Sequence, residues 1–226
     1  MIMNGEIRQI SKKYGKNLVL RDISFEINAG EAVGIIGVNG SGKSTLLRIL
    51  AGVQKADSGQ FIWNGSDILR KGAGTAVAYV PQGTPLIEEL SAYDNLRLWY
   101  EKAALERSLS YGMLKELGVD EFLKKPAKKL SGGMRKRLSV GCAIANEPEI
   151  MLLDEPTAAL DIVAKERLMS YFNGFVQSGG ATILVTHDTQ ELEYCARCYL
   201  LSDGILSLCD KTDRHSLVQR LDQDEK

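Results

Sequence analysis

The residues from 37 to 44 have the types and spacing of a loop that binds phosphate groups. They fit the pattern G-x-x-x-x-G-K-[ST] in full, and they lie between an apolar run and an apolar helical segment. The residues that would surround a triphosphate are Gly37, Val38, Asn39, Gly40, Ser41, Gly42, Lys43, Ser44 and Thr45. Glycines let backbone N–H groups turn toward phosphate oxygens, the lysine reaches the outer phosphates, and Ser44 can bind Mg²⁺. A solvated Gly-rich turn is the alternative, but a lysine in the first turn of a helix then opposes the helix dipole by about 0.3–1 kcal/mol.

Two adjacent carboxylates, Asp154 and Glu155, follow the buried apolar run 150–153. Ligands of open parallel sheets bind at the carboxyl ends of the strands, so this pair is placed for chemistry. Asp154 would hold Mg²⁺ directly or through water, and Glu155 would orient and deprotonate a water molecule for attack on a γ-phosphate. The alternative is an acidic turn broken by Pro156, with Asp154 as a helix N-cap.

A second candidate anion site begins at Ser131, which is placed as the N-cap of a helix, and continues through Gly132 and Gly133. Three basic residues, 135–137, crowd the first turn, which is unfavourable unless negative charge lies opposite. One triphosphate held at Lys43 cannot easily serve both sites. A two-fold dimer solves this, because each chain's Ser131 loop then faces the nucleotide of the other chain. The alternative is a capped helix with a basic exposed face.

The elements that position these residues are predicted from their apolar patterns. Nearly continuous runs at 32–36, 150–153 and 182–185 are typical of strands buried on both faces of a parallel sheet. Apolar and polar residues alternate over 23–27, and the run 61–63 precedes an Asn-Gly turn, which favours an additional antiparallel layer. The predicted fold class is therefore α/β.

Between residues 85 and 147 the apolar spacing becomes helical, with one set that includes Leu96, Trp99 and Tyr100 and a second set from Leu109 to Leu117. We expect this stretch to form a helical subdomain. The predicted organisation is a single domain over residues 1–226, with a core from 1–84 and 148–226 and the subdomain 85–147 inserted.

Together these motifs resemble the ATP-binding cassette (ABC) ATPase family, whose signature sequence looks like Leu130–Gly133 and lies between the phosphate loop and the acidic strand. The resemblance covers nearly the whole chain. It implies a P-loop NTPase (RecA-like) core, an antiparallel β layer and an inserted helical subdomain. It also implies that the protein binds ATP and Mg²⁺ and hydrolyses ATP.

The resemblance also implies roles for residues outside these motifs. Gln82, at the end of 78–82, looks like the family's glutamine that senses Mg²⁺ and water, and His187 matches its γ-phosphate histidine. The stretch Ala159-Leu160-Asp161 looks like the loop that crosses the dimer interface, and Tyr14 sits where the family stacks an aromatic ring on adenine. A strand-edge aromatic is the alternative for Tyr14, and a capping histidine for His187. The implied catalytic residues are Glu155, His187 and Gln82, and the implied metal ligands are Ser44, Gln82 and Asp154.

The family's partners are a second ABC ATPase subunit, in a homodimer or a heterodimer, and membrane-spanning permease subunits. The chain is therefore expected at the cytoplasmic face of the cell membrane. Met134 stands where the commonest signature has glutamine, which is similar to exporter-type members, and the tail after Gly204 is too short for the regulatory domain of many sugar importers. Both features favour export. The alternative is a soluble ABC ATPase of an assembly or remodelling complex without a permease.

Composition restricts other functions. The 28 Lys+Arg and 29 Asp+Glu give a net charge of -1, which provides no global field to hold nucleic acid. We find no signal peptide pattern and no apolar run of 18 residues, so a cytoplasmic protein is expected. The four cysteines predict reduced thiols rather than a disulfide framework. Cys195 and Cys198 form a C-x-x-C pair, which could be redox-active or half of a zinc site, although packing is the simpler interpretation.

Overall fold

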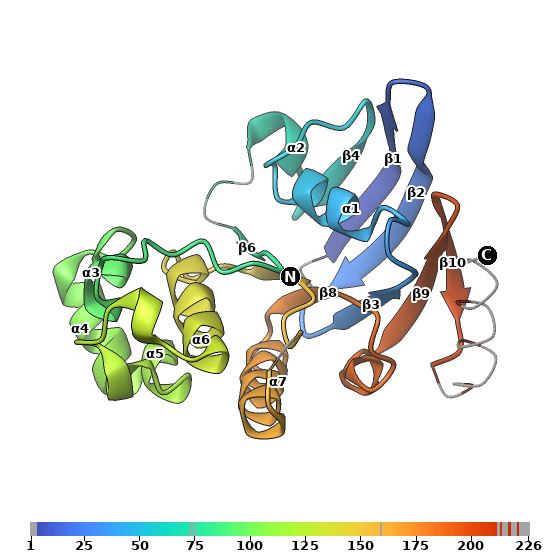
Figure 1. Ribbon diagram of the computed structural model, residues 1–226. Coiled ribbons are helices and arrows are strands. Elements are labelled where there is room, and N and C mark those ends of the chain that lie inside the picture. Colours follow the sequence, from blue (N-terminus) through green and yellow to red (C-terminus); the bar gives the residue numbers. More distant parts are fainter. Residues whose placement is uncertain are drawn as a thin grey trace.

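Two β-sheets and a separate group of helices make up the computed structural model (Figure 1). It describes residues 4–72, 74, 76–158, 160–211, 213, 217 and 221. Ala159, the first residue of the predicted interface loop, lies outside the described residues.

The smaller sheet is antiparallel, with the strand order β2-β1-β4-β5. Its strands are β1 (Asn4–Tyr14), β2 (Asn17–Asn28), β4 (Ser58–Trp63) and β5 (Ser66–Asp67). Ile23, Phe25 and Ile27 of β2 are buried, while Ser24 and Glu26 between them are exposed. The predicted alternation is thus confirmed, because side chains of a strand point alternately to its two faces.

The larger sheet has the order β10-β9-β3-β8-β7-β6, and its strands run parallel from β9 to β6. β10 pairs with β9 in the antiparallel sense. The strands are β3 (Ala32–Ile36), β6 (Val77–Val80), β7 (Ile150–Asp154), β8 (Ala181–Thr186), β9 (Arg197–Ser202) and β10 (Ile205–Cys209). The three predicted buried strands are β3, β7 and β8, so the predicted α/β class is confirmed.

Both faces of this parallel sheet are covered, and β7 contributes to two cores. Ile150 and Leu152 pack with α1 (Lys43–Leu50) and the antiparallel sheet. Met151 and Leu153 pack on the opposite face, with α7 (Ile162–Gln177) and the helical group. Coverage on both faces explains why β7 is apolar at successive positions instead of alternating.

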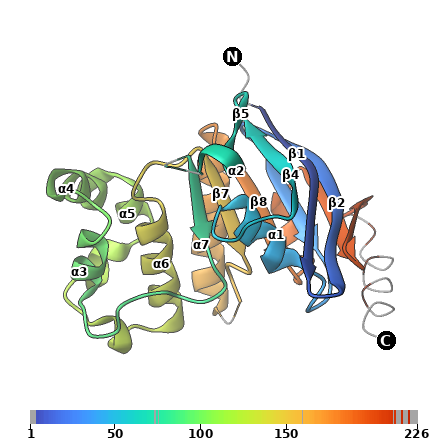
Figure 2. The same ribbon diagram turned by 90° about the horizontal axis from the view of Figure 1, so that it is seen from above.

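The helical group lies beside the sheets in both views (Figures 1 and 2). Its elements are α3 (Ala92–Arg97), α4 (Lys102–Tyr111), α5 (Met113–Glu116), the 3-10 helices η1 (Val119–Phe122) and η2 (Ala127–Lys129), and α6 (Gly132–Ala143). Nearer the sheets, α2 (Ile68–Lys71) follows β5 and the 3-10 helix η3 (Glu191–Tyr194) follows β8. None of the helices in the described ranges has the length and apolar character that a membrane span requires.

Two details differ from the predicted helical pattern. Leu96 and Tyr100 are buried as expected, but Trp99 is 61 % exposed, because α3 ends at Arg97 and the spacing of a continuous helix no longer applies. The second set is divided at Gly112, which separates α4 from α5. A Cβ atom at Gly112 would lie 2.8 Å from Ser108 Cα, so the close packing of this corner requires glycine.

The C-x-x-C pair lies in the interior. Cys195 and Cys198 are buried free thiols. Cys195 packs against Gly34 of β3, where a Cβ atom would lie 3.0 Å from the Cys195 sulfur and 2.7 Å from Leu192. Among the described residues, no group of His, Cys, Asp and Glu side chains is arranged to hold a metal ion. This arrangement agrees with the packing interpretation of the pair.

Candidate active site

The phosphate loop connects β3 to α1, and its glycines are required by its shape. A Cβ atom at Gly37 would lie 2.4 Å from the carbonyl oxygen of Leu201. Gly42 has a φ of +104°, which side chains disfavour. Gly40 has a φ of +85° and no atom within 4 Å of its Cβ position, so this part of the loop faces open space. The loop backbone is thus shaped to receive a ligand on its open side.

Of two polar side chains of the loop, Lys43 is hydrogen-bonded and Ser41 is not, within the described part of the chain. The Lys43 ammonium is folded back and donates hydrogen bonds to the carbonyl oxygens of Gly37 (2.7 Å) and Val38 (2.8 Å). Burial lowers the pKa of Lys43, although the charges of Glu155 and Asp154 oppose this shift. Ser41 Oγ is buried and has no hydrogen-bond partner among the described residues. A buried polar atom without a partner needs an explanation, and a phosphate oxygen at this position supplies one. The loop therefore fits a triphosphate.

Asp154 lies at the end of β7 and is held by two hydroxyl groups. Ser44 Oγ donates to Asp154 Oδ1 at 2.9 Å, and Tyr79 Oη donates to Oδ2 at 3.1 Å. Burial and the negative charge of Asp154 raise the pKa of Tyr79, so Tyr79 stays a neutral donor. Asp154 is not a helix N-cap, because the side chain that caps the next α-helix is that of Asp161. The paired Ser44 and Asp154 oxygens are ligands of the type that Mg²⁺ prefers.

Glu155 is held from two sides by residues that follow neighbouring strands. Gln82, after β6, donates through Nε2 to Glu155 Oε2 at 2.7 Å, and His187 Nδ1, after β8, lies 3.2 Å from Oε1. Since β6 and β8 flank β7 in the sheet, their carboxyl ends meet here. The backbone of Glu155 has a φ of +46°, and its N–H donates to the carbonyl oxygen of Val185 at 2.9 Å. These contacts give the carboxylate a fixed direction.

Ser131 and Asp161 lie together in a different pocket. Ser131 is the N-cap of α6, and its Oγ accepts a hydrogen bond from Met134 N at 3.3 Å, as predicted. Asp161 caps α7 through Ala164 N at 2.8 Å. The lining of their pocket includes Gly133 but no residue of the phosphate loop. The predicted site residues thus fall into two groups within one chain, one around Lys43 and Glu155 and one around Ser131.

The basic side chains of residues 135–137 are bonded to groups of the same subunit. Their sequence pattern had instead predicted a separate negative charge opposite them. Arg135 pairs with Glu88, with its Nη1 2.8 Å from Oε2. Arg137 donates to the carbonyl oxygens of Leu117 (2.9 Å) and Gly118 (3.2 Å). Their charges are met by partners within the subunit, so they do not by themselves indicate an anion.

Lys136 has a role in the site that the sequence analysis missed. Its ammonium donates to the carbonyl oxygens of Pro81 (2.7 Å) and Gln82 (3.3 Å), which ties α6 to the segment that carries Gln82. The residue is only 4 % exposed, and burial lowers its pKa to about 8 against the opposing charges of Asp154, Glu155 and Glu191. The sequence contained one indication that Lys136 is buried. It lies one helical turn before Val140, which is buried, and therefore on the same face of α6.

Tyr14 ends β1 and lies beside the phosphate loop. Its ring is half-exposed, and Lys12 Nζ lies 5.8 Å from the ring centroid. Desolvation raises the pKa of Tyr14, but hydrogen bonds with Gln54 and Thr45 outweigh it and the pKa is lowered. The contact with Thr45 places Tyr14 next to the start of α1.

A buried parallel sheet with this loop after β3 and an Asp-Glu pair at the end of β7 defines a phosphate-loop nucleoside triphosphatase. The family model described as "ABC transporter" matches residues 20–158, more than half of the chain. The chain therefore belongs to the ABC transporter family. It is an ATP-binding and ATP-hydrolysing subunit of that family.

Relatives and solved structures agree with this family. The chain is 31% identical to the lantibiotic transport ATP-binding protein SrtF of Streptococcus pyogenes, over 84% of this chain and 83% of SrtF. It is 35% identical to the spermidine/putrescine import ATP-binding protein PotA of Spiroplasma citri, over 89% of this chain and 59% of PotA. The dimeric post-hydrolysis structure of the ATP-binding cassette MJ0796, bound to ADP and Pi, superimposes with a TM-score of 0.79 at 27% identity, over 90% of this chain and 96% of that one.

Proposed function

We propose that this chain powers an ABC exporter, as one of two ABC ATPase subunits that enclose ATP between them at the cytoplasmic face of separate permease subunits. The observation that carries the proposal is the division of the site. Lys43 and Glu155 form one part, while Ser131 and Asp161 line another pocket. In a two-fold dimer, each part completes the site of the other subunit.

Binding would use the whole phosphate loop. Backbone N–H groups from Gly37 to Thr45 turn toward the phosphates, and Lys43 leaves its carbonyl partners for the outer phosphate oxygens. Ser41 Oγ gains its missing partner, and Tyr14 stacks on adenine.

Mg²⁺ would be held at Ser44, Asp154 and Gln82, where it would neutralise negative charge on the phosphates. Gln82 donates through its nitrogen to Glu155, and the oxygen of the same amide is the atom suited to a cation. Tyr79 keeps Asp154 in place while donating to its second oxygen.

Hydrolysis would use Glu155 as the general base. As water attacks the γ-phosphorus, its proton passes to the Glu155 carboxylate, the bond between the γ-phosphorus and the bridging oxygen breaks, and ADP and phosphate are formed. Gln82 and His187 contact the two oxygens of this carboxylate and so fix its direction. His187, which follows β8, would also contact the γ-phosphate.

The second subunit would add hydrogen-bond donors. Ser131 Oγ and the N–H groups of Gly132 and Gly133 would bind the γ-phosphate held by the other subunit, and Asp161 would lie at the interface. Residues 85–147 would act as a helical subdomain that presents this loop. Met134 follows the glycines without adding a polar side chain, in keeping with the exporter assignment.

The permease would dock on the helical side near Gln82. Ile87 is 47 % exposed there, whereas Leu86 and Tyr93 pack partly against the core. Aspartate at Ile87 should weaken retention on the permease and leave the ATPase activity of the isolated subunit intact. Recovery of an affinity-tagged copy with a membrane protein from detergent extracts would support the transporter. Recovery with soluble proteins alone would favour an assembly or remodelling complex.

Glu155→Gln tests the shared site. The amide keeps the size of the carboxylate but cannot take a proton, so hydrolysis should slow by ~100-fold or more. ATP binding should persist, and lower charge repulsion at the phosphates should stabilise an ATP-bound dimer on size-exclusion chromatography. A variant that stays monomeric with ATP and hydrolyses it at the normal rate would contradict both the general base and the shared site.

A further inference from the structure

Glu191 is a buried carboxylate that the proposed hydrolysis does not use. It lies in η3 and is 2 % exposed. Its Oε1 accepts a hydrogen bond from Thr157 Oγ1 and lies 3.8 Å from Lys165 Nζ. Its Oε2 has no hydrogen-bond partner within the described part of the chain. Burying a carboxylate is unfavourable unless it is paired, so a partly satisfied one in this position calls for a specific role.

The contacts of Glu191 join three segments of the active site. Thr157 is two residues beyond Glu155. Lys165 lies in the first turns of α7, the helix capped by Asp161, and it also donates to Asp188, which directly follows His187. We refer to Thr157, Lys165, Asp188 and Glu191 as the Glu191 cluster.

Asp188 connects Lys165 to residues 186–190, which carry His187 and are called the histidine loop below. Its Oδ1 accepts a hydrogen bond from Gln190 N at 2.8 Å, and its own N–H donates to Thr186 Oγ1 at 2.9 Å. The loop from 186 to 190 is therefore held as a unit, and a shift of Lys165 would displace it together with His187. A displacement of that kind changes the approach of His187 to Glu155, now 3.2 Å apart.

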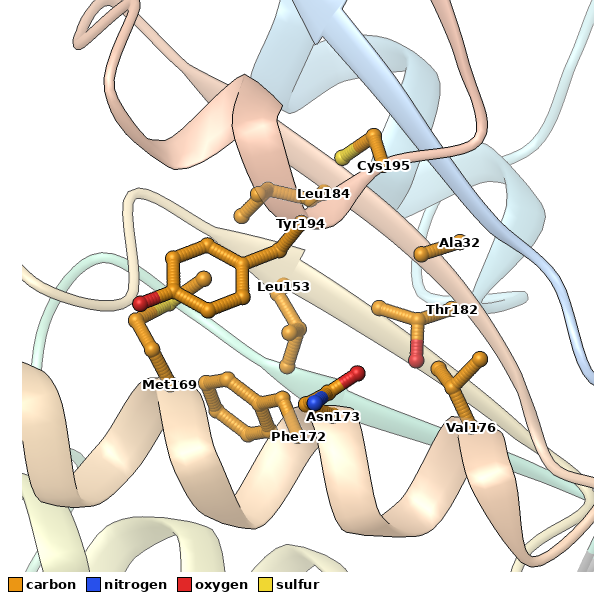
Figure 3. A pocket seen from close by; sticks show the side chains of 10 residues that line it. All are labelled: Ala32, Leu153, Met169, Phe172, Asn173, Val176, Thr182, Leu184, Tyr194 and Cys195. Carbon is orange, nitrogen blue, oxygen red and sulfur yellow. The ribbon is translucent and has the colours of Figure 1, made fainter.

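A small apolar pocket lies along α7 beyond the Glu191 cluster. Figure 3 shows Met169 and Phe172 of α7 facing Tyr194 and Cys195 across a pocket. Met169 lies one helical turn beyond Lys165, so the pocket opens next to the cluster along the same helix. The ion pairs of Lys165 thus connect α7 directly to the loop that carries His187.

We propose that Glu191 is a positioning residue that couples the Asp161 end of α7 to His187. The inference rests on the proposed dimer, in which Asp161 lies at the interface. When the second subunit contacts Asp161, α7 and Lys165 take a fixed position. Through its contacts with Glu191 and Asp188, Lys165 then fixes the position of His187. The catalytic geometry is then complete only in the closed dimer.

The test compares Glu191→Gln with Glu166→Gln, a matched control that changes an exposed glutamate of α7 next to Lys165. Glu191→Gln keeps the size of the side chain and removes its charge. We expect kcat to fall roughly 10- to 100-fold, as for other misplaced catalytic groups, with KM and the affinity for a fluorescent ATP analogue within about twofold of wild type. The Hill coefficient for ATP should stay at the wild-type value, because association of the two subunits is unchanged. Glu166→Gln should match wild type in all of these.

A second arm separates positioning from folding. Lys165→Met should reproduce the loss of kcat, and the double variant Lys165→Met/Glu191→Gln should lose little more than either single variant, because both interrupt one connection. Thr157→Val, which keeps the shape of Thr157, replaces Glu191→Gln in this comparison if that variant does not fold. Normal kcat in both Lys165→Met and the Glu191 or Thr157 variant would overturn the inference, as would lower thermal stability with unchanged kcat per folded subunit.

Failure of the proposed function would look different. The wild-type chain would then show no cooperativity in ATP, and Glu155→Gln would form no dimer. If Glu155→Gln dimerises with ATP and Glu155→Gln/Glu191→Gln does so equally well, the cluster acts after closure, as proposed. If the double variant loses the dimer, Glu191 acts on association instead and the positioning role is wrong.

Discussion

The phosphate loop and the Ser131 loop differ in the contacts that their basic side chains make. At the phosphate loop, Lys43 is folded onto carbonyl oxygens of its own loop and Ser41 Oγ has no partner within the described part of the chain. At the Ser131 loop, the neighbouring basic side chains are engaged inside the subunit, Lys136 with the segment of Gln82 among them. Lys43 is thus bonded only within the loop that would receive the ligand, whereas Lys136 is bonded to another segment of the chain. The pocket of Ser131 also contains Gly133, Arg137 and Arg167.

This difference indicates that the Lys43 side and the Ser131 side of the site have different functions. A mobile cation can follow charge that develops on a phosphate, while fixed backbone donors recognise its position only once it is delivered. ATP should accordingly bind first to the Lys43 side and recruit the Ser131 side of the other subunit afterwards. Changes on the first side should then affect binding, and changes on the second should affect closure or stability.

The largest effect is expected for Lys43→Ala. It removes the cation at the outer phosphates, so steady-state hydrolysis should be abolished and ATP affinity should fall, as measured with a fluorescent ATP analogue. Thermal stability should change little, because the two lost hydrogen bonds go to carbonyl oxygens of the same loop and connect it to no other element. Near wild-type turnover would refute the assignment of the phosphate loop.

Ser131→Arg should affect the Ser131 loop and leave the phosphate loop unchanged. A bulky side chain at the shared site should reduce kcat by on the order of 1,000-fold and remove the ATP-bound dimer of Glu155→Gln, while ATP affinity of the monomer stays close to normal. Size-exclusion chromatography and nucleotide binding measure the two effects separately. Loss of monomer binding would mean that Ser131 belongs to the same subunit's site.

Lys136→Met should alter stability and its pH dependence. Burial lowers the pKa of Lys136 from 10.5 in the unfolded chain to about 8 in the folded one. The unfolded state therefore binds more protons between these values, and stability rises with pH across this window. Wild type should gain roughly 3 kcal/mol relative to Lys136→Met between pH 8 and 10.5, measured by denaturant unfolding of both proteins. Parallel pH profiles would contradict a lowered pKa of Lys136 in the folded protein.

Tyr79→Phe should have the smallest effect. It removes one hydrogen bond to Asp154 and leaves the one from Ser44, so the expected loss is about 1 kcal/mol, or roughly fivefold in kcat/KM. The Mg²⁺ concentration for half-maximal activity should rise if Tyr79 orients Asp154 for the cation. Titration of activity with Mg²⁺ at saturating ATP provides the measurement. An unchanged midpoint would assign Tyr79 to packing alone.

The sequence predicted the features that are contiguous in it. The phosphate loop, the Asp154-Glu155 pair and the Ser131 cap each lie within a few residues, and local backbone preferences determine them. Family resemblance added Gln82 and His187, whose meeting at Glu155 depends on the strand order β8-β7-β6, which the apolar patterns do not contain.

Contacts between distant residues could not be predicted in this way. Tyr79 and Asp154 are 75 positions apart, and Lys136 and Pro81 are 55 apart. No local pattern relates such pairs, because their contact exists only after the sheet and the helical group have packed. Trp99 shows that a local pattern can also mislead. Its helical spacing predicted burial, but α3 ends at Arg97 and Trp99 is exposed.

The dual role of β7 has a consequence for how this chain tolerates changes in length. Met151 and Leu153 fill one core and Ile150 and Leu152 the other, and the same strand ends in Asp154. Deleting one residue within β7 would exchange the two sets of side chains between the faces and turn the carboxylates by one position at the sheet edge. A deletion scan should therefore find no tolerated single-residue deletion from 150 to 154. The surface turn at Asn64-Gly65, where a Cβ atom on the glycine would meet no neighbour within 4 Å, should accept inserted residues.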